Sequence, residues 1–154
     1  MTTSASDGDP GPALQLGRLD GLLGFHLRMA SAAVARDFAD AMQGLDLTQK
    51  QYAVLELIEA NTGVSQVDLA AILGTDRATM MAIVDRLDAR SLLGRRRSAS
   101  DGRRQVLQLT TAGARLLADA RQRVAAHEGR FTAALGNRGA TLIALLREIY
   151  RVPA

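Results

Sequence analysis

Residues 65–113 constrain the fold most, because two short helical patterns around a glycine are followed there by the pattern of a β-hairpin. Ser65 and, three residues later, Asp68 form the pattern of a capping box at a helix start. Gly74 permits the positive φ that ends a helix, so a second helix can begin at once. The order helix, turn, helix, hairpin predicts a winged helix-turn-helix, a shape that docks one helix in a DNA groove.

The second helical pattern, over residues 77–90, separates an apolar face from a face of small side chains, and Thr75 or Asp76 can cap its start. The apolar face consists of Met80, Ile83, Val84 and Leu87. The opposite face consists of Ala78, Ala82, Asp85 and Ala89. Small side chains let a helix approach base edges closely. The expected DNA contacts on this helix are Arg77, Ala78, Thr79, Met81, Ala82 and Arg86. An ordinary surface helix is the alternative, because helix propensity alone also favours alanine.

The hairpin pattern carries a concentration of arginine. Leu92 and Leu93 open one expected strand, and Val106, Leu107 and Leu109 form the other. The sequence RRRSASDGRR lies between them as the expected loop, with the turn-forming pair Asp101-Gly102. Residues 75–105 hold eight arginines and four aspartates, a net charge of 8 − 4 = +4, whereas the whole chain carries +3. A basic hairpin tip beside a helix-turn-helix suits phosphate and minor-groove contacts. The expected contacts here are Arg95, Arg96, Arg97, Asp101, Arg103 and Arg104, with Asp101 orienting a neighbouring guanidinium.

The same segment resembles the DNA-binding domain of the MarR family of winged-helix transcriptional regulators. The matching residues are Leu69-Ala70, Thr79, Val84-Asp85-Arg86-Leu87, Leu92-Leu93, Arg95-Arg96, Asp101 with Arg103, and Leu109-Thr110 with Gly113. The resemblance implies that Arg103 enters the minor groove, that Asp101 braces it, and that Thr79 faces the major groove. The family usually has glycine where this chain has Ser91, so the backbone of that turn must avoid or tolerate the left-handed conformation.

Long apolar stripes flank the winged helix. We expect residues 1–12 to be a disordered tail and residues 13–154 to be one domain, with a winged-helix lobe over 48–110. Residues 13–45 and 111–151 are expected to be dimerisation helices. We expect one long helix from about residue 13 to residue 42 and another, after the hairpin, from about residue 111 to residue 135. A homodimer would bury their stripes and space two recognition helices for a pseudo-palindromic site. An intramolecular bundle is the alternative, and the family resemblance favours the dimer.

The family resemblance also implies a site for a small anionic, often aromatic, ligand between the dimerisation helices and the DNA-binding lobe. The candidate ligand-binding residues are His26, Arg28, Met29, Ala33, Arg36 and Tyr52. Arginine and histidine beside methionine suit an anion with an apolar body. The sequence around Gly24–Arg28 also resembles family members that control the breakdown of aromatic acids, some of which respond to coenzyme A thioesters. In the alternative reading, the histidines are packed core or interface residues.

Composition excludes several other functions. The chain has no cysteine, so thiol-based sensing is excluded. Its two histidines, His26 and His127, lie far apart in the sequence without other metal ligands nearby, so we expect neither a metal nor a cofactor. No nucleophile elbow or phosphate-binding glycine loop is present, and we expect no enzyme activity. The sequence shows no signal peptide and no apolar segment long enough to span a membrane, which indicates a cytoplasmic protein.

Together these features predict a ligand-released homodimeric repressor of mainly α structure, acting on double-stranded DNA. Two alternatives stay open. A non-specific architectural DNA-binding protein would bind scrambled DNA equally well, and a winged-helix protein-interaction module would not need Arg103 for DNA.

Overall fold

The computed structural model describes residues 14–98 and 105–151, which are mainly helical with one antiparallel hairpin. This confirms the fold class expected from the sequence. The chain divides after Val34 into two compact units. The expected disorder of residues 1–12 lies outside the described residues, and the assignment of 13–154 to one domain stays a prediction.

The first helix begins later than the sequence predicts. Helix α1 (Leu23–Ala41) is preceded by a 3₁₀ turn, η1 (Gly17–Gly21), rather than starting near residue 13. Gly17 has a φ of +55°, and Leu22 is extended, with a ψ of 112°. An α-helix cannot continue through either conformation. The expected start was therefore wrong, and its reason is a glycine-rich segment whose apolar periodicity continues through a non-helical backbone.

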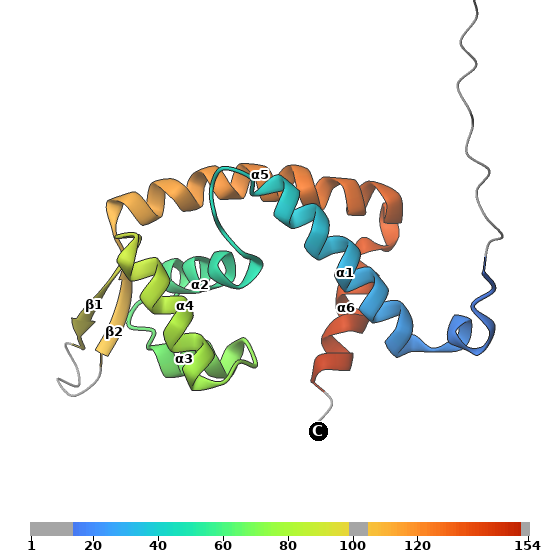
Figure 1. The fold of residues 1–154 in the computed structure, drawn as a ribbon, viewed down its shortest axis with the longest axis horizontal. Coiled ribbons are helices and arrows are strands. Elements are labelled where there is room, and N and C mark those ends of the chain that lie inside the picture. The colour runs from blue at the N-terminus through green and yellow to red at the C-terminus, as the bar shows by residue number, and fades with distance from the viewer. Residues whose placement is uncertain (1–13, 99–104, 152–154) are drawn as a thin grey trace, which may run out of the picture. The chain divides into compact units, whose positions relative to one another are not determined.

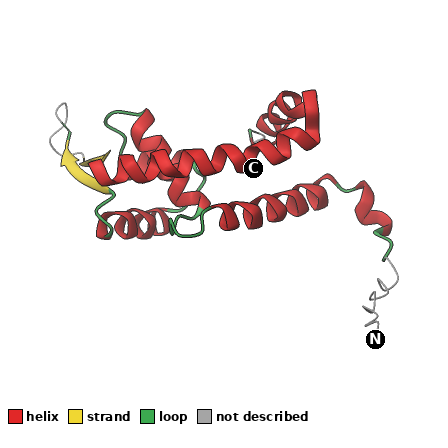
Figure 2. Cartoon of the chain, turned by 90° about the horizontal axis from the view of Figure 1, so that it is seen from above, coloured by secondary structure: helices red, strands yellow, loops and turns green. Residues whose placement is uncertain are grey.

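The other elements lie in the second unit. In chain order they are α2 (Gln49–Ala60), α3 (Gln66–Ile72), α4 (Arg77–Ala89), β1 (Leu93–Arg97), β2 (Gln105–Leu109), α5 (Thr111–Leu135), η2 (Gly136–Arg138) and α6 (Gly139–Tyr150). Figure 1 shows α2, α3, α4 and the hairpin gathered near the start of α5, with α6 at its far end. Figure 2 shows the hairpin, in yellow, beside the start of α5. Helix α5 thus has the bounds that its sequence pattern predicts.

The helix caps expected at Ser65 and at Asp76 are confirmed, and a further capping box begins α2. Capping boxes form between Thr48 and Gln51 at the start of α2 and between Ser65 and Asp68 at the start of α3. Asp76 caps α4, accepting a hydrogen bond of 2.9 Å from the Thr79 amide. These caps satisfy backbone donors that have no partner within a helix, so they fix where each helix begins.

The core of the second unit joins α2, α3, α4, the hairpin and α5. Its completely buried side chains are Val54, Leu55, Leu69, Met80, Val84, Leu87, Leu117 and Ala120. All four residues expected on the apolar face of α4 are buried. On α3, by contrast, only part of the apolar set is buried, because Val67 and Ile72 are 55% and 67% exposed. At about 100° per residue they flank the buried stripe of Leu69 and Ala70 instead of lying on it.

The hairpin begins and ends differently from the sequence expectation. Residues 95–97, predicted to lie in a loop, belong to β1, and Arg97 pairs with Gln105 of β2. Leu93 and Leu107 point into the core. Because side chains alternate along a strand, Arg95 shares the inward side with Leu93 and therefore faces the helices. The Leu107 amide also donates a 2.9 Å hydrogen bond to the Val64 carbonyl, which anchors the hairpin to the loop before α3.

Ser91, in the turn between α4 and β1, has a φ of +57°. A residue with a side chain pays roughly 1–2 kcal/mol for this left-handed conformation. Glycine avoids that cost but loses more conformational entropy on folding. We therefore expect Ser91→Gly to stabilise the protein by about 0.5–1 kcal/mol in urea-induced unfolding. Ser91→Ala is the matched control, since it retains the strained φ and should not stabilise. An equal gain in both variants would contradict this explanation.

Candidate nucleic-acid interface

The face of α4 opposite the core is open to solvent. The predicted contact residues Arg77, Ala78, Thr79, Met81, Ala82 and Arg86 are all exposed. Met80 and Val84 on the other side of the same helix are fully buried, so the rotation of α4 is fixed by packing. In the part of the chain that the structure describes, neither Arg77 nor Arg86 forms an ion pair. The helix therefore presents small side chains flanked by two arginines that are available to an anion.

Thr79 takes part in the cap of α4 as well as in its exposed face. Its hydroxyl donates a 2.6 Å hydrogen bond to Asp76 Oδ2, while its amide donates to Oδ1 of the same carboxylate. These bonds, the hydroxyl bond first, hold the pKa of Asp76 below its usual value. The carboxylate thus stays charged at the positive end of the helix dipole. Thr79 itself is exposed, so its methyl group faces solvent.

Arg95 is held by α4 rather than pointing into solvent from a loop. Its guanidinium forms ion pairs with both Asp85 and Asp88 of α4. The sequence pattern predicts that Asp85 lies on the exposed face and that Asp101 orients a guanidinium, and it gives no sign of this pairing. The aspartates are separated from Arg95 by a turn and a change of secondary structure, so no local pattern signals the contact.

The remaining predicted residues of the wing divide into two groups. Arg96 and Arg97 are exposed at the end of β1, and Arg96 donates a 2.8 Å hydrogen bond to Gln108 Oε1 across the hairpin. Asp101, Arg103 and Arg104 lie outside the described residues. The exposed arginines of β1 and of α4 belong to the same lobe, as Figure 1 shows for the two elements.

Two arginines hold the junction between α1 and α2 by its backbone carbonyls. Arg90, the residue after α4, donates to the carbonyl oxygens of Asp46 and Leu45 at 2.5 and 2.9 Å. Arg123 of α5 donates to the carbonyl oxygens of Gln43 and Ala41 at 2.5 and 3.2 Å. Through Arg90, the C-terminal end of α4 is hydrogen-bonded to this junction. No local sequence pattern predicts these contacts.

The predicted ligand-binding residues are divided between the two units. His26, Arg28, Met29 and Ala33 belong to the first, and Arg36 and Tyr52 to the second. His26 Nε2 lies 2.7 Å from the Asp20 carbonyl oxygen, and the Arg28 guanidinium lies over the Phe25 ring at 5.8 Å. Arg36 is exposed, whereas the Tyr52 ring packs against Phe38 with the centroids 5.9 Å apart. Their role in ligand binding stays a prediction.

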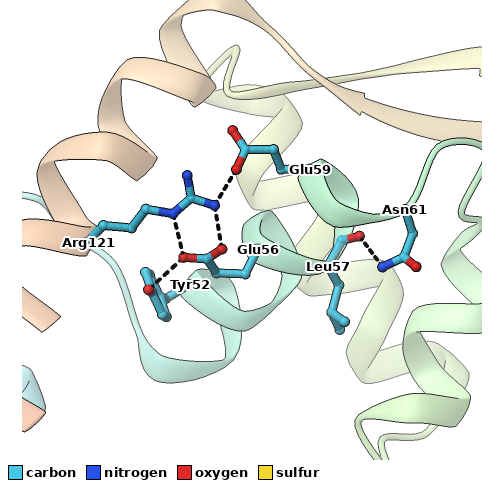
Figure 3. Close-up of polar contacts among 6 residues, drawn as sticks. All are labelled: Tyr52, Glu56, Leu57, Glu59, Asn61 and Arg121. Carbon is cyan, nitrogen blue, oxygen red and sulfur yellow. Dashed lines mark hydrogen bonds and ion pairs between the residues drawn. The ribbon is translucent and has the colours of Figure 1, made fainter. Parts of the chain in front are cut away.

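Tyr52 is part of a polar cluster that ties α2 to α5 (Figure 3). Its hydroxyl donates a 2.6 Å hydrogen bond to Glu56 Oε1, and Glu56 accepts two hydrogen bonds from Arg121, at 2.9 and 2.6 Å. Arg121 also pairs with Glu59. Burial, followed by the bond to Glu56, raises the pKa of Tyr52 to about 12. The Arg121 guanidinium holds the pKa of Glu56 below its ordinary value.

This cluster makes a pH-dependent contribution to stability. Because the folded pKa of Glu56 is lowered, its contribution is present above the ordinary value of 4.5 and is lost as the pH falls through the folded value. We expect Arg121→Gln to reduce the free energy of unfolding by about 1 kcal/mol at pH 7, because the pairs are partly exposed. In urea titrations the difference from wild type should shrink below pH 4.5. A difference that is constant down to pH 3 would contradict it.

A second cluster buries His127. The ring is 1% exposed, its Nδ1 contacts Asp37 of α1, and it packs edge-on against Phe38 and Phe131. Arg130 donates a 2.8 Å hydrogen bond to Asp37 Oδ2, so that carboxylate is shared between two cationic or polar partners. The structure thus favours the packed-core alternative for His127. The contact joins α1 to α5, and its two residues are 90 positions apart in the sequence, so no local pattern signals it.

The described residues bring no three His, Cys, Asp or Glu side chains together in a way that could hold a metal ion. Over the same residues, no helix is both long enough and apolar enough to cross a membrane.

Comparisons with known proteins agree with this geometry. The sequence profile of the MarR family matches residues 44–104. A putative transcriptional regulatory protein for the hcr operon of Thauera aromatica is 37% identical over 138 residues, which cover 88% of this chain and 82% of that protein. The solved structure of the transcriptional repressor CouR bound to a 23-mer DNA duplex has a TM-score of 0.86 at 39% identity, covering 91% of this chain and 100% of that one. CouR bound to p-coumaroyl-CoA has a TM-score of 0.82 at 36% identity, covering 92% and 100%.

Proposed function

The chain belongs to the MarR family of DNA-binding transcriptional regulators, and from this premise we propose that it is a homodimeric repressor released from its operator by an aromatic acid or the CoA thioester of one. The carrying observation is the exposed small-residue face of α4 beside the basic strand β1, in a chain 39% identical to a repressor solved on a DNA duplex. A regulator with this site reads DNA and is not an enzyme.

The DNA-binding step would place α4 in the major groove and the hairpin along the backbone or minor groove. Thr79, Met81, Ala78 and Ala82 would meet base edges, and Arg77 and Arg86 would bind bases or phosphates. Arg103, by the family resemblance, would enter the minor groove. The 23-mer duplex bound by CouR is long enough for two half-sites spaced by one helical turn.

The dimer is supported by apolar surface on the last helix. Leu142, Ile143, Leu145 and Ile149 of α6 are between 37% and 51% exposed, although they are large and apolar. A second copy of the chain covering this face would remove that surface from water and set two α4 helices about a two-fold axis. An intramolecular bundle would instead have buried these side chains within the chain.

The ligand class is supported by the relative that was solved with p-coumaroyl-CoA. An aromatic thioester offers an apolar ring together with phosphates, and Arg28 and Arg36 could pair with such phosphates. Release requires that the ligand prefer a spacing of the recognition helices that does not fit the operator. A preference of about 1–3 kcal/mol is typical of such coupling.

Gel-shift titration of the purified protein tests the proposal, using the DNA upstream of its own gene and a scrambled duplex at physiological salt. p-Coumarate and p-coumaroyl-CoA are then added separately at equal concentration. Selective binding that one compound abolishes supports a ligand-released repressor and identifies which form acts. Equal binding to both duplexes would favour an architectural DNA-binding protein, and selective binding insensitive to both compounds would overturn the ligand class.

A further inference from the structure

The link between Arg95 and the recognition helix has a functional meaning that a phosphate contact would not explain. We propose that Arg95 is a positioning residue, which bridges strand β1 to α4 and neutralises two carboxylates on the DNA-reading side, rather than a residue that binds DNA. This inference rests on the proposed DNA-binding function and changes the role that the sequence assigns to Arg95.

The geometry suits a bridge. Asp85 and Asp88 stand three residues apart on α4, so they lie on one side of the helix. One guanidinium nitrogen of Arg95 pairs with each of them. A planar guanidinium can satisfy two carboxylates at once, which a single ammonium group cannot do with the same geometry. The side chain of Arg95 is 30% exposed, so most of it is covered by this contact and by the strand.

Thr110, the N-cap of α5, holds the turn between α4 and β1. It donates through its hydroxyl to the Ser91 carbonyl at 2.6 Å and through its amide to the Leu92 carbonyl at 3.1 Å. Leu93 and Leu107 also join the hairpin to the buried face of α4 through the shared core. These contacts hold the base of the hairpin, whereas Arg95 pairs with α4 further along β1, toward the end of the strand. Arg95 therefore adds a polar contact that fixes the wing relative to α4 beyond its base.

The charge of Asp85 gives the bridge its second consequence. On a helix of about 100° per residue, Asp85 lies close to the line through Ala78 and Ala82, the small residues of the exposed face. Its side chain is 56% exposed. An unpaired carboxylate at this position would face the phosphates of a bound duplex and repel them. Arg95 removes that repulsion, which explains how a recognition surface tolerates an acidic residue at its centre.

The test compares wild type with Arg95→Gln and with the triple variant Asp85→Asn, Asp88→Asn, Arg95→Gln. Affinity for the operator and for a scrambled duplex is measured by fluorescence anisotropy over a range of salt, well below the melting temperature of each protein. Arg97→Gln, an exposed arginine of the same strand that is expected to contact DNA, is the comparison in which one phosphate contact is lost, so its logarithmic salt slope should fall by about 0.9. Circular dichroism establishes that each variant is folded.

We expect Arg95→Gln to weaken DNA binding by about tenfold or more, since juxtaposed like charges are costly at an interface. The triple variant should regain most of that affinity, because no unpaired carboxylate is left. Its salt dependence should equal that of wild type, as no phosphate contact has been removed. The salt slope is the slope of the logarithm of the affinity against the logarithm of the salt concentration. If this slope were smaller in the triple variant than in wild type by about 0.9, a phosphate contact would have been lost and the proposal would be overturned.

Two further outcomes separate this inference from the function on which it rests. Unchanged affinity in Arg95→Gln, or a triple variant as weak as Arg95→Gln, would overturn the role of Arg95. Equal binding of wild type to operator and scrambled DNA would instead overturn operator recognition, while the same variants still report on Arg95 with the scrambled duplex. The salt slope of the triple variant is decisive even if Arg95→Gln fails to fold.

Discussion

Ala82→Glu is expected to abolish operator binding while leaving the fold intact. Ala82 is exposed at the middle of the small-residue face of α4, opposite the buried Val84. Glutamate is a good helix former, so the substitution costs little stability. In the complex its carboxylate would lie against base edges and phosphates. This contact would be unfavourable both because of its size and because of its negative charge. We expect operator affinity to fall by about 100-fold or more, since like-charge contacts at an interface cost several kcal/mol.

The measurement is an anisotropy titration with operator DNA, accompanied by thermal melting. Ala118→Glu is the matched control, because Ala118 is an exposed alanine on another helix, α5, and size-exclusion chromatography establishes that this variant keeps the oligomeric state of wild type. The control should bind DNA nearly as wild type does. If Ala82→Glu bound the operator with unchanged affinity, α4 would not be the element that enters the groove, and the protein-interaction alternative would be favoured.

Gly113→Ala is expected to produce the largest loss of stability. Gly113 lies in the first turn of α5 and is buried where that helix crosses the turn between α4 and β1. A Cβ at this position would lie 1.8 Å from the Leu92 carbonyl oxygen and 2.8 Å from its carbonyl carbon. Both are backbone atoms, so the side chain cannot simply rotate away and the helix or the turn must move. We expect a loss of about 3 kcal/mol or more in the free energy of unfolding.

The matched control is Gly129→Ala, in the same helix. A Cβ there meets nothing within 4 Å in the chain, and alanine is the better helix former. It should therefore stabilise by up to about 1 kcal/mol. Both variants are compared by urea denaturation at equal protein concentration, because an oligomer is stabilised by mass action. A Gly113→Ala protein as stable as wild type would show that α5 and the Leu92 turn are not held in this contact.

These two sites act on the same unit in different ways. Ala82 lies on the surface that we propose contacts DNA, while Gly113 lets α5 pack against the turn that precedes the hairpin. Thr110, which caps α5, also donates to the Ser91 carbonyl at 2.6 Å. The hairpin, α4 and α5 are therefore joined at one turn. A movement of α5 would be transmitted through this turn to the surface that we propose contacts DNA.

The sequence by itself determined the features that arise within a few residues. Side chains three positions apart fixed the capping boxes of α2 and α3, and a 3.6-residue period fixed which face of α4 is buried. The bounds of α5 followed in the same way. These features depend on hydrogen bonds and burial local to one turn, which the order of residues specifies directly. The prediction of where α1 begins was wrong, because the apolar periodicity of the sequence continues through Gly17, whose backbone is left-handed.

Only the tertiary structure decided which distant residues meet. Arg95 pairs with Asp85 and Asp88, and Arg90 reaches the carbonyls of a junction more than forty residues earlier. A long charged side chain can reach many partners, and its choice depends on where packing places whole helices, which no local pattern encodes. The sequence therefore predicts a DNA-contacting surface from its composition, whereas the structure shows which of its arginines form ion pairs within the protein.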